Sequence, residues 1–270
     1  MPRPMSSDNP HPSYASQGRR VLLEVIVSSL DDARAAAGGG ADRFEMCAAL
    51  ALGGLTPSLG LLNAVKREVP HVPVMFMLRP REAGMAYTEA DLSVMQRDAE
   101  LALEHGADGL VFGVLTERGE VDAEACQRLH RIARQRPDVQ TVFHRAFDVV
   151  ADADAALDRL IGLGFTRVLT SGRAPLAVDG LDEIRRTRER AAGRIEVLPG
   201  GGINPTNVAR VVAETGVDQV HLSLTRAAPD RSTRANPAVR FAVDQPPDES
   251  AYRATDEQAV RTVRRILDGT

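Results

Sequence analysis

Short apolar runs alternate with polar turns and helical stretches along the chain from about residue 21 onward. The runs are rich in Val, Ile, Leu and Phe and scarcely alternate with polar residues, which is typical of parallel strands buried on both faces. We predict eight strands, beginning near Leu22, Arg43, Val72, Gly109, Gln140, Arg167, Ile195 and Gln219. Eight β–α units in one continuous chain favour an α/β fold of the closed (β/α)8 TIM-barrel type over an open sheet with fewer strands.

The predicted helices carry recognisable end signals. Glycine tolerates the left-handed conformation that stops a helix, and four helix-to-strand junctions have one, at Gly40, Gly106, Gly164 and Gly216. Candidate N-terminal caps are Thr56 before Pro57, Thr88, Asn204 before Pro205, and Thr255 or Asp256 for the last helix. The recurrence of one junction is an internal repeat, which supports the barrel.

The two ends of the barrel sequence differ from the repeat. Residues 1–20 contain Pro, Ser and Gly without an apolar core and are predicted to be a disordered leader. Residues 21–270 are predicted to form a single barrel domain. Within it, residues of about 227–254 are rich in Pro, Asp, Arg and Ser and are predicted to be an irregular loop before the final helix.

Composition excludes several classes of protein. The net charge is −4, with 33 basic and 37 acidic residues and no basic cluster, so a nucleic-acid partner is not expected. No apolar run approaches the ~20 residues that cross a bilayer, so no membrane span is expected. The two cysteines make no disulfide framework, and a reducing, cytoplasmic setting is expected.

Charged side chains interrupt strands that should be apolar, and an unpaired buried ion is costly. They are Glu24 in the first strand, Arg43 and Glu45 with Cys47 in the second, Arg79 and Arg81 after the third, His144, Arg145 and Asp148 at the fifth, and His221 in the eighth. An ion-pair cluster that fills the barrel is an alternative role for Glu24 and Arg43, which lie early in their strands. The groups at strand ends lie where barrel active sites form, and arginine suits an anionic ligand.

A glycine run follows the seventh strand. Gly200, Gly201 and Gly202 could bring main-chain N–H groups close to an anion, at a position where barrels often bind phosphate, and Ser171 after the sixth strand could add a donor. The alternative is that the glycines only form a tight turn. No GxGxxG turn follows the first strand and no GxSxG is present, so a nicotinamide cofactor and a serine hydrolase are not expected.

Several stretches together resemble the CutC copper-homeostasis family. They are GADRFEMCAALALGGLTPSLG, MLRPREAGMAYTEAD, GADGLVFGVLTERGEVD, TVFHRAFD, RVLTSG and EVLPGGGI, and they cover nearly the whole predicted barrel. The resemblance implies a TIM barrel, a cytoplasmic protein, self-association into dimers or larger oligomers, and a role in handling copper. Relatives often have a cysteine where this chain has Ile26, whereas Cys47 is present. Cu(I) prefers two or more soft ligands, so this departure weakens the expectation of copper binding.

Two functions therefore remain open. In the first, a protein that handles copper without catalysis binds Cu(I) through Cys47, with Met77 or a cysteine of a partner subunit in a homo-oligomer (dimer or tetramer). In the second, an enzyme of the lyase, isomerase or hydrolase type acts on a small anionic or phosphorylated metabolite. For that enzyme, the candidate catalytic residues are His144, Glu45 and Asp148, and the candidate ligand-binding residues are Glu24, Arg43, Arg79, Arg81, Arg145, Ser171, Gly200, Gly201, Gly202 and His221.

Overall fold

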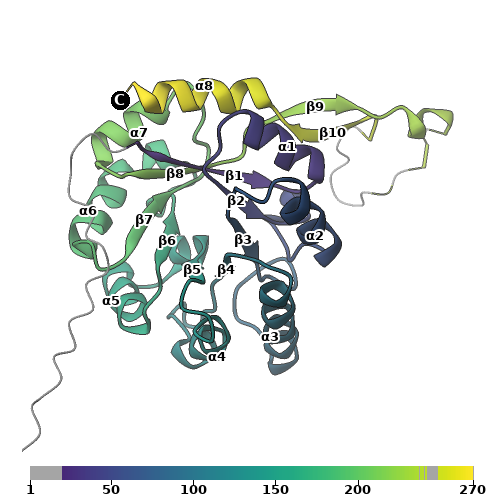
Figure 1. Ribbon diagram of the computed structural model, residues 1–270. Coiled ribbons are helices and arrows are strands. Elements are labelled where there is room, and N and C mark those ends of the chain that lie inside the picture. The colour runs from purple at the N-terminus through teal and green to yellow at the C-terminus, as the bar shows by residue number, and fades with distance from the viewer. Residues whose placement is uncertain (1–19, 237, 240, 242–248, 270) are drawn as a thin grey trace, which may run out of the picture.

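Eight parallel strands form a barrel surrounded by helices, which confirms the predicted (β/α)8 fold (Figure 1). The computed structural model describes residues 20–236, 238, 239, 241 and 249–269. The barrel strands are β1 (Leu22–Val27), β2 (Arg43–Met46), β3 (Val74–Met77), β4 (Gly109–Phe112), β5 (Gln140–Phe143), β6 (Arg167–Thr170), β7 (Glu196–Pro199) and β8 (Gln219–Leu222). The predicted leader of residues 1–20 lies outside the described residues, except for Arg20.

The barrel closes at a seam between β7 and β8. Hydrogen bonding runs continuously in the order β7-β6-β5-β4-β3-β2-β1-β8, and a single bridge from Gly200 to His221 joins the two ends. Strand β1 lies between β2 and β8, where Glu24 is in register with Arg43 on one side and with His221 on the other. The register therefore brings together three of the charged residues that interrupt apolar strands.

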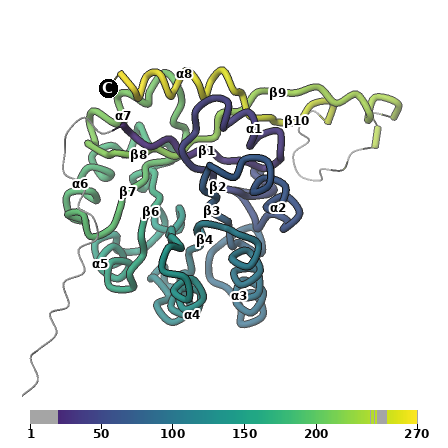
Figure 2. Tube along the Cα trace, in the orientation of Figure 1, coloured from purple at the N-terminus to yellow at the C-terminus, as the bar shows by residue number. Residues whose placement is uncertain are grey.

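Helices cover the outside of the barrel (Figure 2). They are α1 (Leu30–Gly38), α2 (Leu59–Glu68), α3 (Glu89–Glu104), α4 (Ala123–Ala133), α5 (Ala153–Leu163), α6 (Leu181–Ala191), α7 (Val208–Thr215) and α8 (Glu257–Asp268). Side chains alternate along each strand, so one set packs against the helices, as Phe44 and Phe76 do. The other set fills the barrel, where an apolar cluster contains Cys47, Met75, Met77, Val111, Val142, Leu169 and Leu198.

The helix C-terminal signals in the sequence are confirmed. All four junction glycines adopt positive φ, between +69° at Gly216 and +92° at Gly40. Among the N-terminal signals, Thr88 caps α3 in a capping box with Asp91, and Asp256 caps α8. These two caps were also predicted correctly.

Two predicted caps are wrong. Helix α2 begins after Ser58, because the Thr56 hydroxyl instead accepts a hydrogen bond from the Arg79 main-chain N–H at 2.9 Å. Helix α7 begins after Asn207, because the Asn204 side chain accepts from Thr206 N–H at 2.9 Å and forms a local turn. The glycine run is therefore separated from the first turn of α7.

The segment predicted as an irregular loop contains two strands at its ends. Strands β9 (Thr225–Pro229) and β10 (Ala251–Thr255) pair antiparallel and project from the barrel beside α1 and α8 (Figure 1). The Asp32 carboxylate in α1 accepts a hydrogen bond from the Thr255 N–H at 2.7 Å. The sequence concealed this pair because half of the β9–β10 residues are exposed and its strands lack an apolar pattern.

No helix in the described part of the chain is both long enough and apolar enough to cross a membrane.

Candidate functional site

A cavity of about 370 Å³ opens at the carboxyl ends of the barrel strands, where active sites of this fold are built. Its walls combine apolar side chains with a few polar groups, as is typical of small-molecule sites. The lining residues are Ile26, Glu45, Cys47, Leu50, Gly53, Met77, Arg79, Met85, His144, Arg145, Leu169, Gly201, Gly202, Ile203, His221 and Ser223.

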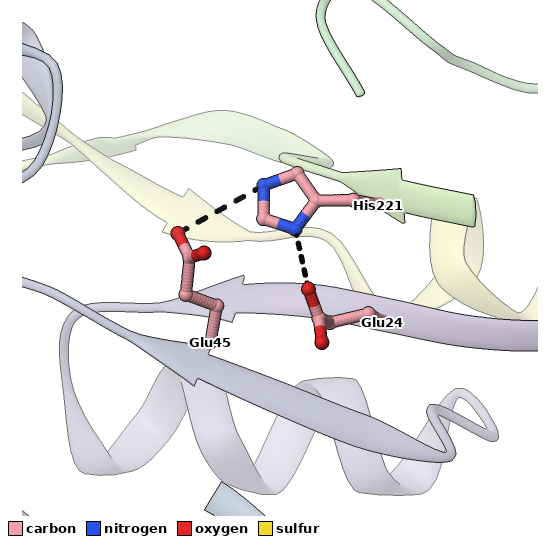
Figure 3. Close-up of side chains that lie close together, drawn as sticks. All are labelled: Glu24, Glu45 and His221. Carbon is pink, nitrogen blue, oxygen red and sulfur yellow. Dashed lines mark hydrogen bonds and ion pairs between the residues drawn. The ribbon is translucent and has the colours of Figure 1, made fainter. Parts of the chain in front are cut away.

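Glu24, His221 and Glu45 form a line of polar groups across the seam side of the cavity (Figure 3). His221 Nδ1 lies 2.7 Å from Glu24 Oε1, and His221 Nε2 lies 3.9 Å from Glu45 Oε1. The second carboxyl oxygen of Glu45, Oε2, is buried and has no hydrogen-bond partner. Glu45 and His221 line the cavity, whereas Glu24 lies behind His221.

The protonation of these groups follows from burial and from their neighbours. Burial, together with the negative charge of Glu24, raises the pKa of Glu45 to about 7, although His221 and Arg43 oppose the shift. Burial alone would raise the pKa of Glu24, but Arg43 and the hydrogen bond with His221 outweigh it and hold that pKa below its usual range. Burial would lower the pKa of His221, but Glu45 and Glu24 raise it. Near neutral pH, Glu45 can therefore both take and give a proton.

Behind Glu24, a buried ionic network fills the lower barrel. Arg43 is hydrogen-bonded to Glu24 through Nε and to Gln219 at 2.8 Å. Arg167, only 2% exposed, pairs with Glu196 at 2.7 Å. Arg43 and Glu24 do not line the cavity, although both were predicted as ligand-binding residues. Their contacts agree with the alternative role, an ion-pair cluster that fills the barrel. From the sequence, Arg167 was not predicted to be part of this network. A charged residue at the start of an apolar strand was the signal that could have indicated it.

His144 follows β5 and presents one unpartnered ring nitrogen. Its Nδ1 accepts a hydrogen bond from the Ala146 N–H at 3.1 Å, so in the neutral ring the proton is on Nε2. This Nε2 is buried without a partner. Burial, with the charge of Arg79, lowers the pKa of His144 to about 4. At neutral pH His144 is therefore a neutral hydrogen-bond donor, which suits it poorly to the expected role of general acid or base.

Arg79 follows β3 and is held by main-chain carbonyls. Its Nη1 donates to Leu52 and Gly54 at 2.9 and 3.0 Å, and its Nη2 donates to Ala83 at 3.0 Å. Its Nε is buried without a partner. Within the described part of the chain, no carboxylate pairs with Arg79, whereas the buried Arg43, Arg167 and Arg264 pair with Glu24, Glu196 and Asp42. A buried, uncompensated cation at a cavity favours an anionic ligand.

Arg145 and Asp148 belong to a short 3₁₀ helix (Arg145–Val149) that follows His144. The strand alternation that would have placed Asp148 beside His144 does not extend into this helix, and Asp148 does not line the cavity. Its carboxylate instead accepts hydrogen bonds from Thr170, from both the N–H and the hydroxyl of Ser171, and from Arg145 Nε at 2.7 Å. Asp148 and Ser171 thus hold Arg145 in place. We expected both residues at the site, but neither lines the cavity.

The glycine run forms part of the cavity wall through Gly201 and Gly202. Both have positive φ, +107° and +71°, which glycine adopts readily. Gly200 is not part of the lining because its N–H donates to Thr170 and the residue bridges the seam. A Cβ at Gly201 would lie 3.4 Å from Arg145 Nη1, so this run and the guanidinium are neighbours. No hydrogen bond recorded among the described residues uses Nη1 of Arg145 or the N–H of Gly202.

Arg81 lies away from the cavity. Strand β3 ends at Met77, so the strand alternation predicted to carry Arg81 to the same face as Arg79 no longer applies. Arg81 pairs with Asp91 at 3.2 Å and donates to main-chain carbonyls of residues 82, 84 and 86. These contacts hold the loop before α3, and Arg81 does not line the cavity.

Soft ligands are concentrated at one wall of the cavity. Cys47 and Met77 both line it, and a Cβ at Gly54 would lie 3.3 Å from Cys47 Sγ and 4.0 Å from Met77 Cε. Burial and the charge of Glu45 raise the pKa of the Cys47 thiol to about 12.

Cys126 is buried in α4, in the outer layer, as expected. Among the described residues, Glu24, Glu45 and His221 could together approach a hard metal ion, but Glu24 is already bonded to Arg43 and His221.

Some lining residues come from the connections between strands and helices and were missed in the sequence. Leu50 and Gly53 lie between β2 and α2, and Met85 lies between β3 and α3. Leu50 packs against the apolar cluster inside the barrel and Met85 against the outer core. No sequence pattern predicted that they line the cavity, because an apolar side chain between a strand and a helix can equally pack against the core.

Comparison with known proteins identifies the family. The CutC family model matches residues 21–226. A CutC family protein of Treponema denticola is 45% identical over 249 residues, which cover 92% of this chain and 100% of the relative. The copper homeostasis protein cutC homolog of Homo sapiens is 44% identical and covers 91% of this chain and 88% of its own. The crystal structure of the copper homeostasis protein CutC of Streptococcus agalactiae superimposes with a TM-score of 0.71 at 33% identity, over 74% of this chain and 97% of that one. The chain therefore belongs to the CutC family.

Proposed function

We propose that this CutC-family protein is an enzyme that removes a proton from a small anionic metabolite and returns it. The metabolite would bind in the mouth of the barrel. One observation carries the proposal: Glu45 lines the cavity with an unpartnered carboxyl oxygen, and His221, oriented by Glu24, stands on its other side. A buried carboxyl whose pKa lies near neutrality is suited to general acid–base catalysis. A carboxyl with no such task would be expected to have both oxygens hydrogen-bonded.

The cationic side of the cavity supports an anionic ligand. Arg79 has no carboxylate partner among the described residues, and Arg145 has an Nη1 for which no hydrogen bond is recorded. Glu45 in β2 and His221 in β8 line the same cavity as Arg79 and Arg145, which follow β3 and β5. A ligand held by its anionic group at the arginines can therefore present another atom to Glu45.

Hydrogen exchange with solvent tests this function on many candidate substrates at once. The protein is incubated in D₂O with a panel of small carboxylated and phosphorylated metabolites, and loss of C–H signals is followed by proton NMR. We expect exchange of at least one compound with the wild type and its loss with Glu45→Gln. Exchange that is equal in the two proteins, or absent throughout the panel, would contradict the proposal. Glu117→Gln, at an exposed position, is the matched control.

A second candidate function is Cu(I) binding, and the position of Cys47 Sγ and Met77 Cε, both beside Gly54 at the cavity, favours it. The relatives named copper homeostasis proteins support the same metal. A thiolate and a thioether are soft ligands that suit Cu(I), and metal binding would have to displace the thiol proton. Anaerobic Cu(I) titration of wild type, Cys47→Ser and Met77→Leu tests this. Weak binding that is the same in all three would contradict it.

We further propose a cytoplasmic location and a homo-oligomer. Both cysteines are free and buried, which supports a reducing compartment. Fractionation of cells that express the protein and light scattering of the purified protein test the two statements. Recovery outside the cytoplasm would contradict the first, and a monomeric mass at all concentrations would contradict the second.

A further inference from the structure

We infer that Arg79 Nε–H and His144 Nε2–H bind one oxygen atom of the substrate together, so that the substrate is a carbonyl compound whose oxygen gains negative charge during the reaction. This inference rests on the proposed proton transfer and names its substrate class.

Both donors are buried and unsatisfied. Arg79 is 5% exposed and His144 is 4% exposed, and neither Arg79 Nε nor His144 Nε2 has a hydrogen-bond partner. A buried donor without a partner is unfavourable, so a pair of them at one cavity is unexpected without a ligand. Other polar atoms of the two side chains are satisfied, which leaves these two N–H groups to the ligand.

The backbone brings the two side chains toward each other. Arg79 follows β3 and His144 follows β5, and β4 lies between these strands. At the end of β4, a Cβ on Gly113 would lie 2.6 Å from ring atoms of His144. The imidazole therefore lies across the end of β4, on the path toward β3. The effect of the Arg79 charge on the pKa of His144 agrees with this placement.

Both donors are held in place before a ligand arrives. Three main-chain carbonyls fix the fork of Arg79, and the Ala146 N–H fixes the tautomer of His144. A neutral imidazole beside a guanidinium avoids a second buried positive charge. Fixed donors aimed at developing negative charge lower a barrier more than mobile ones, since they need no reorganisation.

The reaction that this arrangement serves is removal of a proton from the carbon beside the carbonyl. The Glu45 carboxylate forms an O–H bond as the substrate C–H bond breaks. The C–H electron pair becomes a C=C bond, and the carbonyl π pair moves onto oxygen, which the two donors stabilise. Return of the proton to carbon or oxygen completes the step, so no oxidant, reductant or further reactant is needed.

Binding of oxalate, a planar dianion that mimics the enolate of a 2-oxo acid, tests the donor pair separately from catalysis. Affinity is measured by calorimetry for wild type, His144→Ala, His144→Gln and Glu45→Gln. Loss of one hydrogen bond to a charged oxygen predicts about tenfold or more weaker binding by His144→Ala. His144→Gln, which keeps an N–H donor, should recover most of that loss. Glu45→Gln should keep oxalate affinity while losing proton exchange.

The outcomes separate the two proposals. Oxalate binding that depends on His144, without proton exchange on any metabolite, would retain the donor pair and remove the proposed function. Oxalate affinity unchanged in His144→Ala, or no oxalate binding by the wild type at millimolar concentration, would overturn the inference. As a readout that does not depend on a variant's folding, ¹⁵N NMR of the wild type should show the His144 Nε2–H proton moving downfield when oxalate binds. An Nε2 signal that does not respond to bound oxalate would also overturn it.

Discussion

His221 Nδ1 and Glu24 Oε1 lie 2.7 Å apart across the β1–β8 junction, and this contact orients the imidazole so that its Nε2 faces Glu45. Glu24 is itself bonded to Arg43, which keeps its carboxyl ionised. The contact therefore links the cavity to the ionic network below it. A group at the cavity wall is thus positioned by residues that do not line the cavity themselves, as in other sites in which a carboxylate fixes a histidine tautomer.

Removal of the Glu24 charge should destabilise the barrel strongly. Glu24→Gln leaves the Arg43 guanidinium buried without a carboxylate, and loss of one partner of a buried pair costs about 3–5 kcal/mol. The free energy of unfolding in urea measures the effect. The double variant Glu24→Gln, Arg43→Gln should lose less free energy of unfolding than the two single variants lose in sum, because neither charge is then left without its partner. Additive costs would show that the two charges do not interact.

Glu45→Gln should change how stability depends on pH. The folded-state pKa of Glu45 is about 7, above its ordinary value of 4.5. The stabilising contribution of the buried neutral carboxyl is therefore complete below pH 4.5 and is lost as the pH rises to about 7, by on the order of 3 kcal/mol. We expect Glu45→Gln to lose this slope and to gain stability relative to wild type at pH 8. Urea unfolding at pH 5 and pH 8 measures the free energy of unfolding of both proteins. If this free energy changed equally between the two pH values in wild type and Glu45→Gln, the raised pKa of Glu45 would be contradicted.

Gly113→Ala should displace His144. The new Cβ would lie 2.6 Å from the imidazole and 2.9 Å from the Ala146 Cβ, so the ring has to move. We expect a loss of about 1–3 kcal/mol, typical of overpacking, and a changed ¹⁵N NMR signal of His144. Gly162→Ala is the matched control, since nothing lies within 4 Å of its Cβ and helix α5 favours alanine. A similar response in both variants would show that His144 does not rest on Gly113.

The two thiols should be unreactive in the folded protein. Burial raises the pKa of both Cys47 and Cys126 to about 12, and the thiolate is the reactive form. At pH 8 we expect iodoacetamide to label neither residue in the native protein and both in urea, as measured by mass spectrometry of peptides. Rapid native labelling of Cys47 would instead reveal an accessible, ionised thiol in the cavity.

The barrel could be predicted from the sequence because its signals are local and repeated. The strand runs and the four glycine junctions each depend on a few neighbouring residues, and the structure has all of them. The β9–β10 pair escaped prediction because its stability depends on contacts such as Asp32 with Thr255, which are far apart in the sequence.

The candidate site was predictable only as far as strand alternation reached. Alternation correctly brought Glu45, Cys47 and His221 to the inside of the barrel, where they line the cavity. It failed for Arg81 and Asp148, because their strands end before them. The free oxygen of Glu45 and the donor role of His144 depend on hydrogen-bond partners, which no sequence pattern specified.

The seam between β7 and β8 also fixes when the site can exist during protein synthesis. Glu24 belongs to the first barrel strand, whereas His221 belongs to the last, 197 residues later. A ribosome therefore has to release nearly the whole barrel before the two residues can meet and close it. Until then, Arg43 lacks its partner Gln219, Glu24 lacks His221, and Glu45 has no histidine beside it. Nascent or truncated chains that lack β8 consequently lack His221 beside Glu45, so the proposed proton transfer would be confined to chains that include β8.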